Sequence, residues 1–287
     1  MKRIAVVLLS ALAFLQVNAQ KLPNVQQVSL RAPANIKVDG RASDWGDKFE
    51  AYNPATDLYY TIANDDKRLY FIFLSDSKKV RGNATPGAVS VSSPALINYL
   101  VNGGIRINIQ KNANKNDKGV PGVVFPYFKE GAGISFFLTN AGVMDKDADS
   151  IMKANNKRLN SGVKWIYTTG ISGVDTELPV YNEKGIEAAN AFDIRKSYIC
   201  EFAIDLEHLG LSISDPSKFS YHIILNGGPR KYSLINQTLQ NAPKIGKNAD
   251  GSAMTEAQVN KIYDDLRSAQ DPNAASSDFW GEYTLAK

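Results

Sequence analysis

The sequence contains few of the residues that most often carry catalysis, redox chemistry or metal binding. Its 287 residues include one cysteine, Cys200, and two histidines, His208 and His222. A single cysteine cannot form an intramolecular disulfide, so the fold must be stabilised by packing rather than by a covalent cross-link. Cys200 alternates with apolar neighbours, a pattern that indicates a buried structural thiol rather than a reactive one.

Catalytic motifs are absent as well. The histidines do not form a His-x-x-x-His spacing, and neither a Gly-x-Ser-x-Gly motif nor a cysteine nucleophile motif occurs. A glycosidase that uses two carboxylates has no fixed spacing between them in its sequence, because the two acids need only lie close together in the folded protein. Glu201 is the candidate for one of these two acids, since it lies among apolar residues of a predicted strand. The alternative is a structural charge that faces outward or pairs with an arginine.

Long apolar runs are confined to the start of the chain. Residues 1–19 have the form of a signal peptide, in which Lys2 and Arg3 precede the apolar run Ile4–Leu15 and the small-residue site Val17–Ala19. We therefore expect cleavage at that site and export to the periplasm or the cell exterior. An uncleaved anchor helix is the alternative. The rest of the chain has no apolar run of about eighteen residues, so we expect no membrane span in it.

Charge of one sign is not in excess. The formal net charge is +4, and the two basic residues of the signal peptide contribute half of it. Such a balance does not indicate nucleic acid or an anionic membrane as a partner. We expect residues 20–287 to form a single domain with a polar, partly helical insertion at about 236–277. Within the insertion, Thr255–Gln258 has the form of a capping box.

What the sequence does contain is short apolar–polar alternation, which predicts antiparallel β-structure. Leu58–Ala63 and Leu69–Leu74 flank a polar loop and form a predicted β-hairpin. Ile105–Gln110 is the clearest strand, with three isoleucines on one face and three polar residues on the other. The fold class that we expect is all-β, mainly an antiparallel β-sandwich with short helical insertions. Further elements are predicted at Val123–Phe128, Gly133–Thr139, Val163–Thr169, Tyr198–Ile204 and Phe219–Leu225 (strands) and at Ser150–Leu159 (helix).

Three segments resemble a known group of domains. They are Ile36–Asp76, which contains Val-Asp-Gly, Asp-Trp and Asn-Asp-Asp-Lys; Tyr198–Leu211, which ends in a Leu-x-x-Leu-Gly corner; and Asp278–Ala286. Together they resemble the family 9 carbohydrate-binding modules and the wider DOMON-like sandwiches. The resemblance implies an immunoglobulin-like β-sandwich. It does not imply one function, because such sandwiches bind sugars, bind haem or serve as structural adaptors.

A sugar site needs an aromatic ring against the apolar face of the sugar and polar side chains for its hydroxyl groups. Trp165 and Tyr167 place two aromatic rings on one face of a predicted strand. The polar face of the clearest strand offers Arg106, Asn108 and Gln110. We predict these five as the ligand-binding residues. The alternative is that both aromatic residues fill the core, where Trp45 and Trp280 are also expected.

A calcium loop is a weaker candidate. Asp145, Asp147 and Asp149 fit the first acidic positions of an EF-hand. Ser150 and Asn156, however, occupy positions where an EF-hand needs glycine and glutamate. A solvated acidic turn is favoured, and a looser calcium site stays open.

Haem is an option that the resemblance brings, since some DOMON-like domains hold it with a methionine and a histidine. No Cys-x-x-Cys-His attachment site is present. Candidates by residue type alone are His208, His222, Met144, Met152 and Met254.

These observations favour an exported, non-catalytic binding module for carbohydrate or a related small polar ligand at the cell envelope, without an obligatory cofactor. The first alternative is an envelope interaction or scaffolding protein. It would dock another protein through the sandwich face or the insertion at 236–277. A haem-binding domain or a glycosidase comes third.

Overall fold

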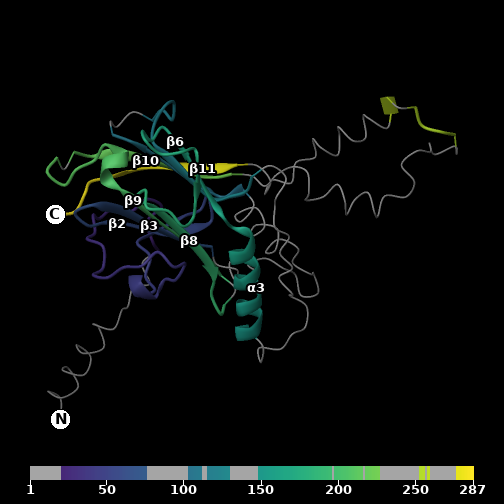
Figure 1. Cartoon of the computed structure of the whole chain (residues 1–287), viewed down its shortest axis with the longest axis horizontal. Coiled ribbons are helices and arrows are strands. Elements are labelled where there is room, and N and C mark those ends of the chain that lie inside the picture. The colour runs from purple at the N-terminus through teal and green to yellow at the C-terminus, as the bar shows by residue number, and fades with distance from the viewer. Residues whose placement is uncertain are drawn as a thin grey trace, which may run out of the picture.

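Two antiparallel β-sheets form the body of the protein in the computed structural model (Figure 1). The five-stranded sheet has the order β1-β2-β3-β9-β8, and the six-stranded sheet has the order β11-β10-β4-β5-β6-β7. The prediction of an all-β sandwich is confirmed. The structure describes residues 21–75, 103–111, 115–129, 148–195, 197–215, 217–226, 252–255, 257–258 and 276–287.

The strands are short, as is usual for a sandwich. The five-stranded sheet contains β1 (Ala51–Asn53), β2 (Leu58–Asn64), β3 (Arg68–Ser75), β9 (Tyr198–Asp205) and β8 (Ile186–Phe192). The six-stranded sheet contains β11 (Ser277–Tyr283), β10 (Phe219–Leu225), β4 (Ile105–Gln110), β5 (Gly122–Tyr127), β6 (Trp165–Thr169) and β7 (Glu177–Pro179). The helices are α3 (Ala148–Gly162) and the short 3-10 helices η1 (Ser43–Trp45) and η4 (Leu206–Leu209).

Most predicted elements are confirmed. The predicted hairpin is β2 and β3, and the predicted helix is α3, which is longer at both ends than expected. The sequence does not predict β8, because its alanines and asparagine have low strand propensity. The strand predicted at Gly133–Thr139 lies outside the described residues. No helix in the described part of the chain is long and apolar enough to cross a membrane.

The hydrophobic core lies between the two sheets. The ring of Phe202 on β9 packs edge-on against Phe73 of its own sheet and Phe125 of the other, with centroids 5.9 and 6.1 Å away. The hydroxyl groups of Tyr60 and Tyr221 meet across the sheets at 2.9 Å, so these buried polar atoms are paired. Cys200 is also in this core, which confirms its predicted burial.

A buried carboxylate fastens the segment before β1 to the outer face of the five-stranded sheet. Glu201 on β9 is 1% exposed. Its Oε2 accepts hydrogen bonds from the backbone amides of Asp39, Gly40 and Arg41 at 3.0, 2.6 and 3.2 Å. Its Oε1 accepts one from Trp45 Nε1 at 2.7 Å. Burial raises the pKa of Glu201 to about 7, although the bonds from Trp45, Gly40 and Asp39 act to lower it.

These contacts make Glu201 a structural anchor. Glu201 faces outward from the core, as one alternative predicted, but its oxygens bind the donors of the loop rather than an arginine side chain. Trp45 is half-buried beside a second apolar cluster on this face. The predicted core position of Trp45 is therefore only partly right. The members of that cluster are Ala42, Ile72, Leu74 and Ile199.

Helix α3 lies beside β8 (Figure 1) and is fastened to it by one side chain. The amide of Asn156 donates to Phe192 O at 3.0 Å and accepts from Phe192 N at 2.7 Å. One turn further along α3, Leu159 is buried in the main core. The helix thus covers the edge of β8, which would otherwise present unpaired backbone groups.

We expect Asn156→Ala to lower the free energy of unfolding by about 2 kcal/mol, because both backbone groups of Phe192 lose their partner. Urea unfolding of a protein that comprises residues 20–287 measures this. Asn160→Ala is the matched control, since Asn160 is an exposed residue of the same helix, and it should cost less than about 0.5 kcal/mol. An equal loss of unfolding free energy in the two variants would contradict the conclusion that Asn156 fastens α3 to β8.

Candidate functional site

The five residues predicted to bind ligand share one face of the six-stranded sheet. On β4, Ile105, Ile107 and Ile109 point into the core, so the side chains of the alternate residues lie on the outer face. On β6, Ile166 is in the core, and its neighbours Trp165 and Tyr167 are half-buried on the outer face. Strand β5 lies between the two strands. The alternative that Trp165 and Tyr167 fill the core is wrong.

A third aromatic residue joins them because β5 is irregular. The register of β5 and β6 shifts between Val124 and Tyr127, and Tyr127 then pairs with Trp165. Such an irregularity moves side chains to the other face of a strand. The rings of Tyr127 and Tyr167 are 4.9 Å apart at 39°. Sequence periodicity could not find Tyr127, because a regular strand would turn it inward.

Cations lie close to two of these rings. The guanidinium carbon of Arg106 is 6.0 Å from the centroid of the Tyr167 ring. The ammonium nitrogen of Lys129 is 3.6 Å from the centroid of the Trp165 ring. Both distances fit cation–π contact. The rings therefore present electron-rich faces beside hydrogen-bond donors.

Glu177 on β7 completes this group. Its Oε2 is 2.8 Å from Lys129 Nζ, and its Oε1 accepts a hydrogen bond from the Tyr127 hydroxyl at 3.1 Å. The bond from Lys129 lowers the pKa of Glu177 most, and the bond from Tyr127 adds to this effect. Glu177 is thus a fixed acceptor next to the rings. We call Arg106, Tyr127, Lys129, Trp165, Tyr167 and Glu177 the aromatic patch.

Asn108 and Gln110 lie on the same face but outside the patch. Asn108 is 5% exposed, and its Oδ1 has no hydrogen-bond partner. A Cβ on Gly122 would come within 2.4 Å of that oxygen, so glycine at this position leaves the room that Asn108 occupies. The amide of Gln110 reaches Asn116 O at 3.4 Å. Of the three polar residues predicted on β4, Arg106 is the one that contacts the aromatic residues.

A separate polar cluster surrounds His222 on β10. Its Nδ1 is 2.6 Å from Asp117 Oδ2, and its Nε2 is 2.7 Å from Asp278 Oδ2. Because a carboxylate only accepts, both contacts are hydrogen bonds when both ring nitrogens carry a proton. The ring also stacks on Trp280, with centroids 4.1 Å apart and planes 13° from parallel. The predicted core position of Trp280 is wrong, because this ring lies on the outer face of the sheet.

The other candidates for metal or haem are dispersed or already engaged. His208 Nε2 is 2.6 Å from Lys184 O. Its neighbours Asp205 and Glu207 bring their oxygens within 4.8 Å of its ring nitrogen, but Asp205 is bonded to Arg68 at 3.0 Å. A cation at this site would compete with a guanidinium. Of the haem candidates, Met144 lies outside the described residues, while Met152 and Met254 lie on α3 and in the short described stretch 252–255.

The predicted acidic turn and the predicted insertion are described only in part. Asp145 and Asp147 lie outside the described residues, and Asp149 forms an ion pair with Lys153 on α3. The capping box in the insertion is confirmed by reciprocal bonds between Thr255 and Gln258, at 2.9 Å and 3.3 Å. Within 236–277 the structure describes only residues 252–255, 257–258 and 276–277.

No family model matches the chain, and no curated protein matches it in sequence. The likeness to carbohydrate-binding modules stays a prediction from the sequence motifs. Function is therefore argued from the aromatic patch and its surroundings.

Proposed function

We propose that the protein is a non-catalytic binding module and that a carbohydrate binds on its aromatic patch. The observation that supports this most is the position of Trp165 and Tyr167. They stand outside the core on a sheet face that also carries Arg106, Lys129 and Glu177. Aromatic rings next to a few polar groups of both charges are the chemistry that saccharide recognition needs.

Each part of the patch has a role in this proposal. The indole of Trp165 and the phenol ring of Tyr167 would contact the C–H groups of a pyranose ring. Arg106 and Lys129 would donate hydrogen bonds to its hydroxyl oxygens, and Glu177 would accept from its hydroxyl hydrogens. Five side chains of the patch stand on β-strands, and Lys129 lies two residues after β5, so binding requires little further ordering of the backbone.

Lys129 must leave the face of Trp165 for a sugar to stack there. Its side chain is 45% exposed, and that of its partner Glu177 is 39% exposed. An ion pair of this exposure contributes about 0–1 kcal/mol, and the cation–π contact with Trp165 adds about 0.5–1 kcal/mol. Moving Lys129 aside is therefore a small cost that stacking of the sugar on the indole can offset. Together with the predicted signal peptide, the proposal describes an exported module that works at the cell envelope.

We expect Trp165→Ala to weaken saccharide binding by about tenfold to a hundredfold, the usual loss when a central aromatic contact is truncated. A glycan array of the mature protein, residues 20–287, identifies the ligand, and calorimetry measures the affinity. Tyr59→Ala is the matched control, because Tyr59 is a half-buried aromatic residue of the five-stranded sheet. The saccharide affinity of Tyr59→Ala should stay within twofold of that of the unsubstituted protein.

Two results would contradict the proposal. One is an array without binding when circular dichroism shows that the protein is folded. The other is an equal loss of affinity in Trp165→Ala and Tyr59→Ala. The first result would favour the alternative that the module docks another envelope protein, and the second would place the saccharide away from the aromatic patch.

A further inference from the structure

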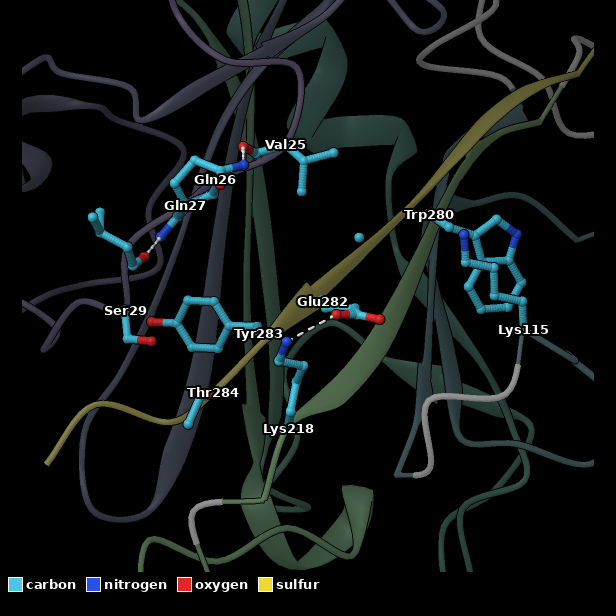
Figure 2. Close-up of a pocket in the computed structure, with 12 residues that line it drawn as sticks. Val25, Gln26, Gln27, Ser29, Lys115, Lys218, Trp280, Glu282, Tyr283 and Thr284 are labelled. Carbon is cyan, nitrogen blue, oxygen red and sulfur yellow. Dashed lines mark hydrogen bonds and ion pairs between the residues drawn. The ribbon is translucent and has the colours of Figure 1, made fainter.

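A groove of about 380 Å³ runs along β11, at the end of the six-stranded sheet away from the aromatic patch. One wall is the segment 25–29, and the other is formed by β11 from Trp280 to Tyr283 and by the next residue, Thr284, as Figure 2 shows. Lys115 and Lys218 complete the lining. The volume lies in the range of about 300–1,000 Å³ that is typical of small-molecule sites.

Both walls of the groove are held in place. The side chain of Gln26 bonds the backbone of Ile62 in both directions, at 2.8 and 2.7 Å. A hydrogen bond connects the two walls: the backbone N–H of Leu30, directly after segment 25–29, donates to the Tyr283 hydroxyl of β11 at 2.9 Å. The groove is therefore preformed rather than created when a ligand arrives.

Trp280 supplies a fixed aromatic wall. It pairs with His222 across the strands, and the imidazole covers one face of the indole at 4.1 Å. His222 is itself held by Asp117 and Asp278 through both ring nitrogens. Trp280 also lines the groove, so the imidazole leaves part of the indole open to a ligand.

Among the residues that line the groove, two lysines, Lys115 and Lys218, face one carboxylate, Glu282. Lys218 pairs with Glu282 at 3.1 Å, whereas Lys115 forms no ion pair with any carboxylate in the described ranges. The two aspartates nearby face the ring nitrogens of His222. Neutral hydrogen-bonding groups of Gln27, Ser29 and Thr284 also line the groove.

We propose that this groove is a second ligand site and that it takes an acidic saccharide unit. The pyranose ring lies against Trp280, its carboxylate pairs with Lys115, and its hydroxyl groups meet Glu282 and Gln27. The site shares no residue with the aromatic patch. Four strand spacings separate β11 from β6, which is about 19 Å, so the two sites bind independently.

The test is calorimetric titration of the mature protein with trigalacturonate and with neutral galactotriose. We expect trigalacturonate to bind at least tenfold more tightly than galactotriose, and Lys115→Met to remove that preference. Lys118→Met is the matched control, since Lys118 is an exposed lysine close by that does not line the groove. It should change the affinity by less than twofold. Equal affinity for the two sugars, or equal effects of the two lysine variants, would overturn the proposal.

A second comparison separates this site from the aromatic patch. Trp165→Ala should leave trigalacturonate binding unchanged. If Trp165→Ala abolishes it and Lys115→Met does not, the acidic sugar binds on the patch and the groove assignment is wrong. If the glycan array is blank for neutral sugars while trigalacturonate binds through Lys115, the patch proposal fails and the groove stands.

Discussion

Replacing Glu201 with alanine should lower the free energy of unfolding by about 4 kcal/mol. The substitution removes the acceptor for three backbone amides and the Trp45 indole. A donor left without a partner in a buried place costs about 1–3 kcal/mol. Some of the four donors will bind water once the side chain is removed. The expected loss of unfolding free energy is therefore near the lower end of the sum over the four donors. Urea unfolding followed by circular dichroism measures the change.

Glu187→Ala is the control for this prediction. Glu187 is a half-buried residue of the adjacent strand β8, and its bond to Arg68 is an ion pair with both side chains partly exposed, at 44% and 31%. Such a pair contributes about 0–1 kcal/mol. If Glu201→Ala costs no more than Glu187→Ala, Glu201 does not anchor the segment before β1.

We expect Gly40→Ala to destabilise the protein by at least about 3 kcal/mol. Gly40 has φ of +79°, and a Cβ there would lie 2.7 Å from the carbonyl carbon of Asn190 and 2.8 Å from the nitrogen of Ala191. Both atoms belong to the backbone of β8 and cannot move aside easily. The loop must retreat, and its hydrogen bond to Glu201 breaks as it does so.

Gly46→Ala is the control that separates the clash of a Cβ with β8 from the cost of placing alanine in a left-handed backbone conformation. Gly46 has φ of +66°, but a Cβ there meets nothing within 4 Å. Only the left-handed backbone opposes this substitution, so it should cost about 1–2 kcal/mol. Thermal unfolding of both variants tests the difference. Equal shifts of Tm would show that Gly40 is not packed against β8 as described.

The fold could be predicted in large part because its strands alternate with a period of two. Ile105–Gln110 shows the reason: its isoleucines fill the core and its polar residues face outward. The same rule placed Trp165 and Tyr167 together on one face. It could not decide which face was buried, since that depends on the partner sheet. The structure decides it, because Ile166 between them is in the core.

The rest of the candidate site depends on contacts that no local pattern records. Tyr127 reaches the face through a shift in register, and Glu177 reaches it from a strand of three residues. Lys129 follows β5 in a segment without periodicity. Glu201 illustrates the same limit, because the loop that it binds lies some 160 residues earlier in the sequence. An isolated strand pattern cannot reveal such a partner.

The three tryptophans allow saccharide binding on the aromatic patch to be tested in one experiment. Each indole N–H reports on a different place: Trp45 on the loop held by Glu201, Trp165 on the aromatic patch and Trp280 on the groove. Two-dimensional NMR resolves the three signals, and single tryptophan-to-phenylalanine variants assign them. On titration with the saccharide identified by the array, we expect the Trp165 signal to shift and the Trp45 signal to stay. A saccharide that binds without moving the Trp165 signal would contradict binding on the patch.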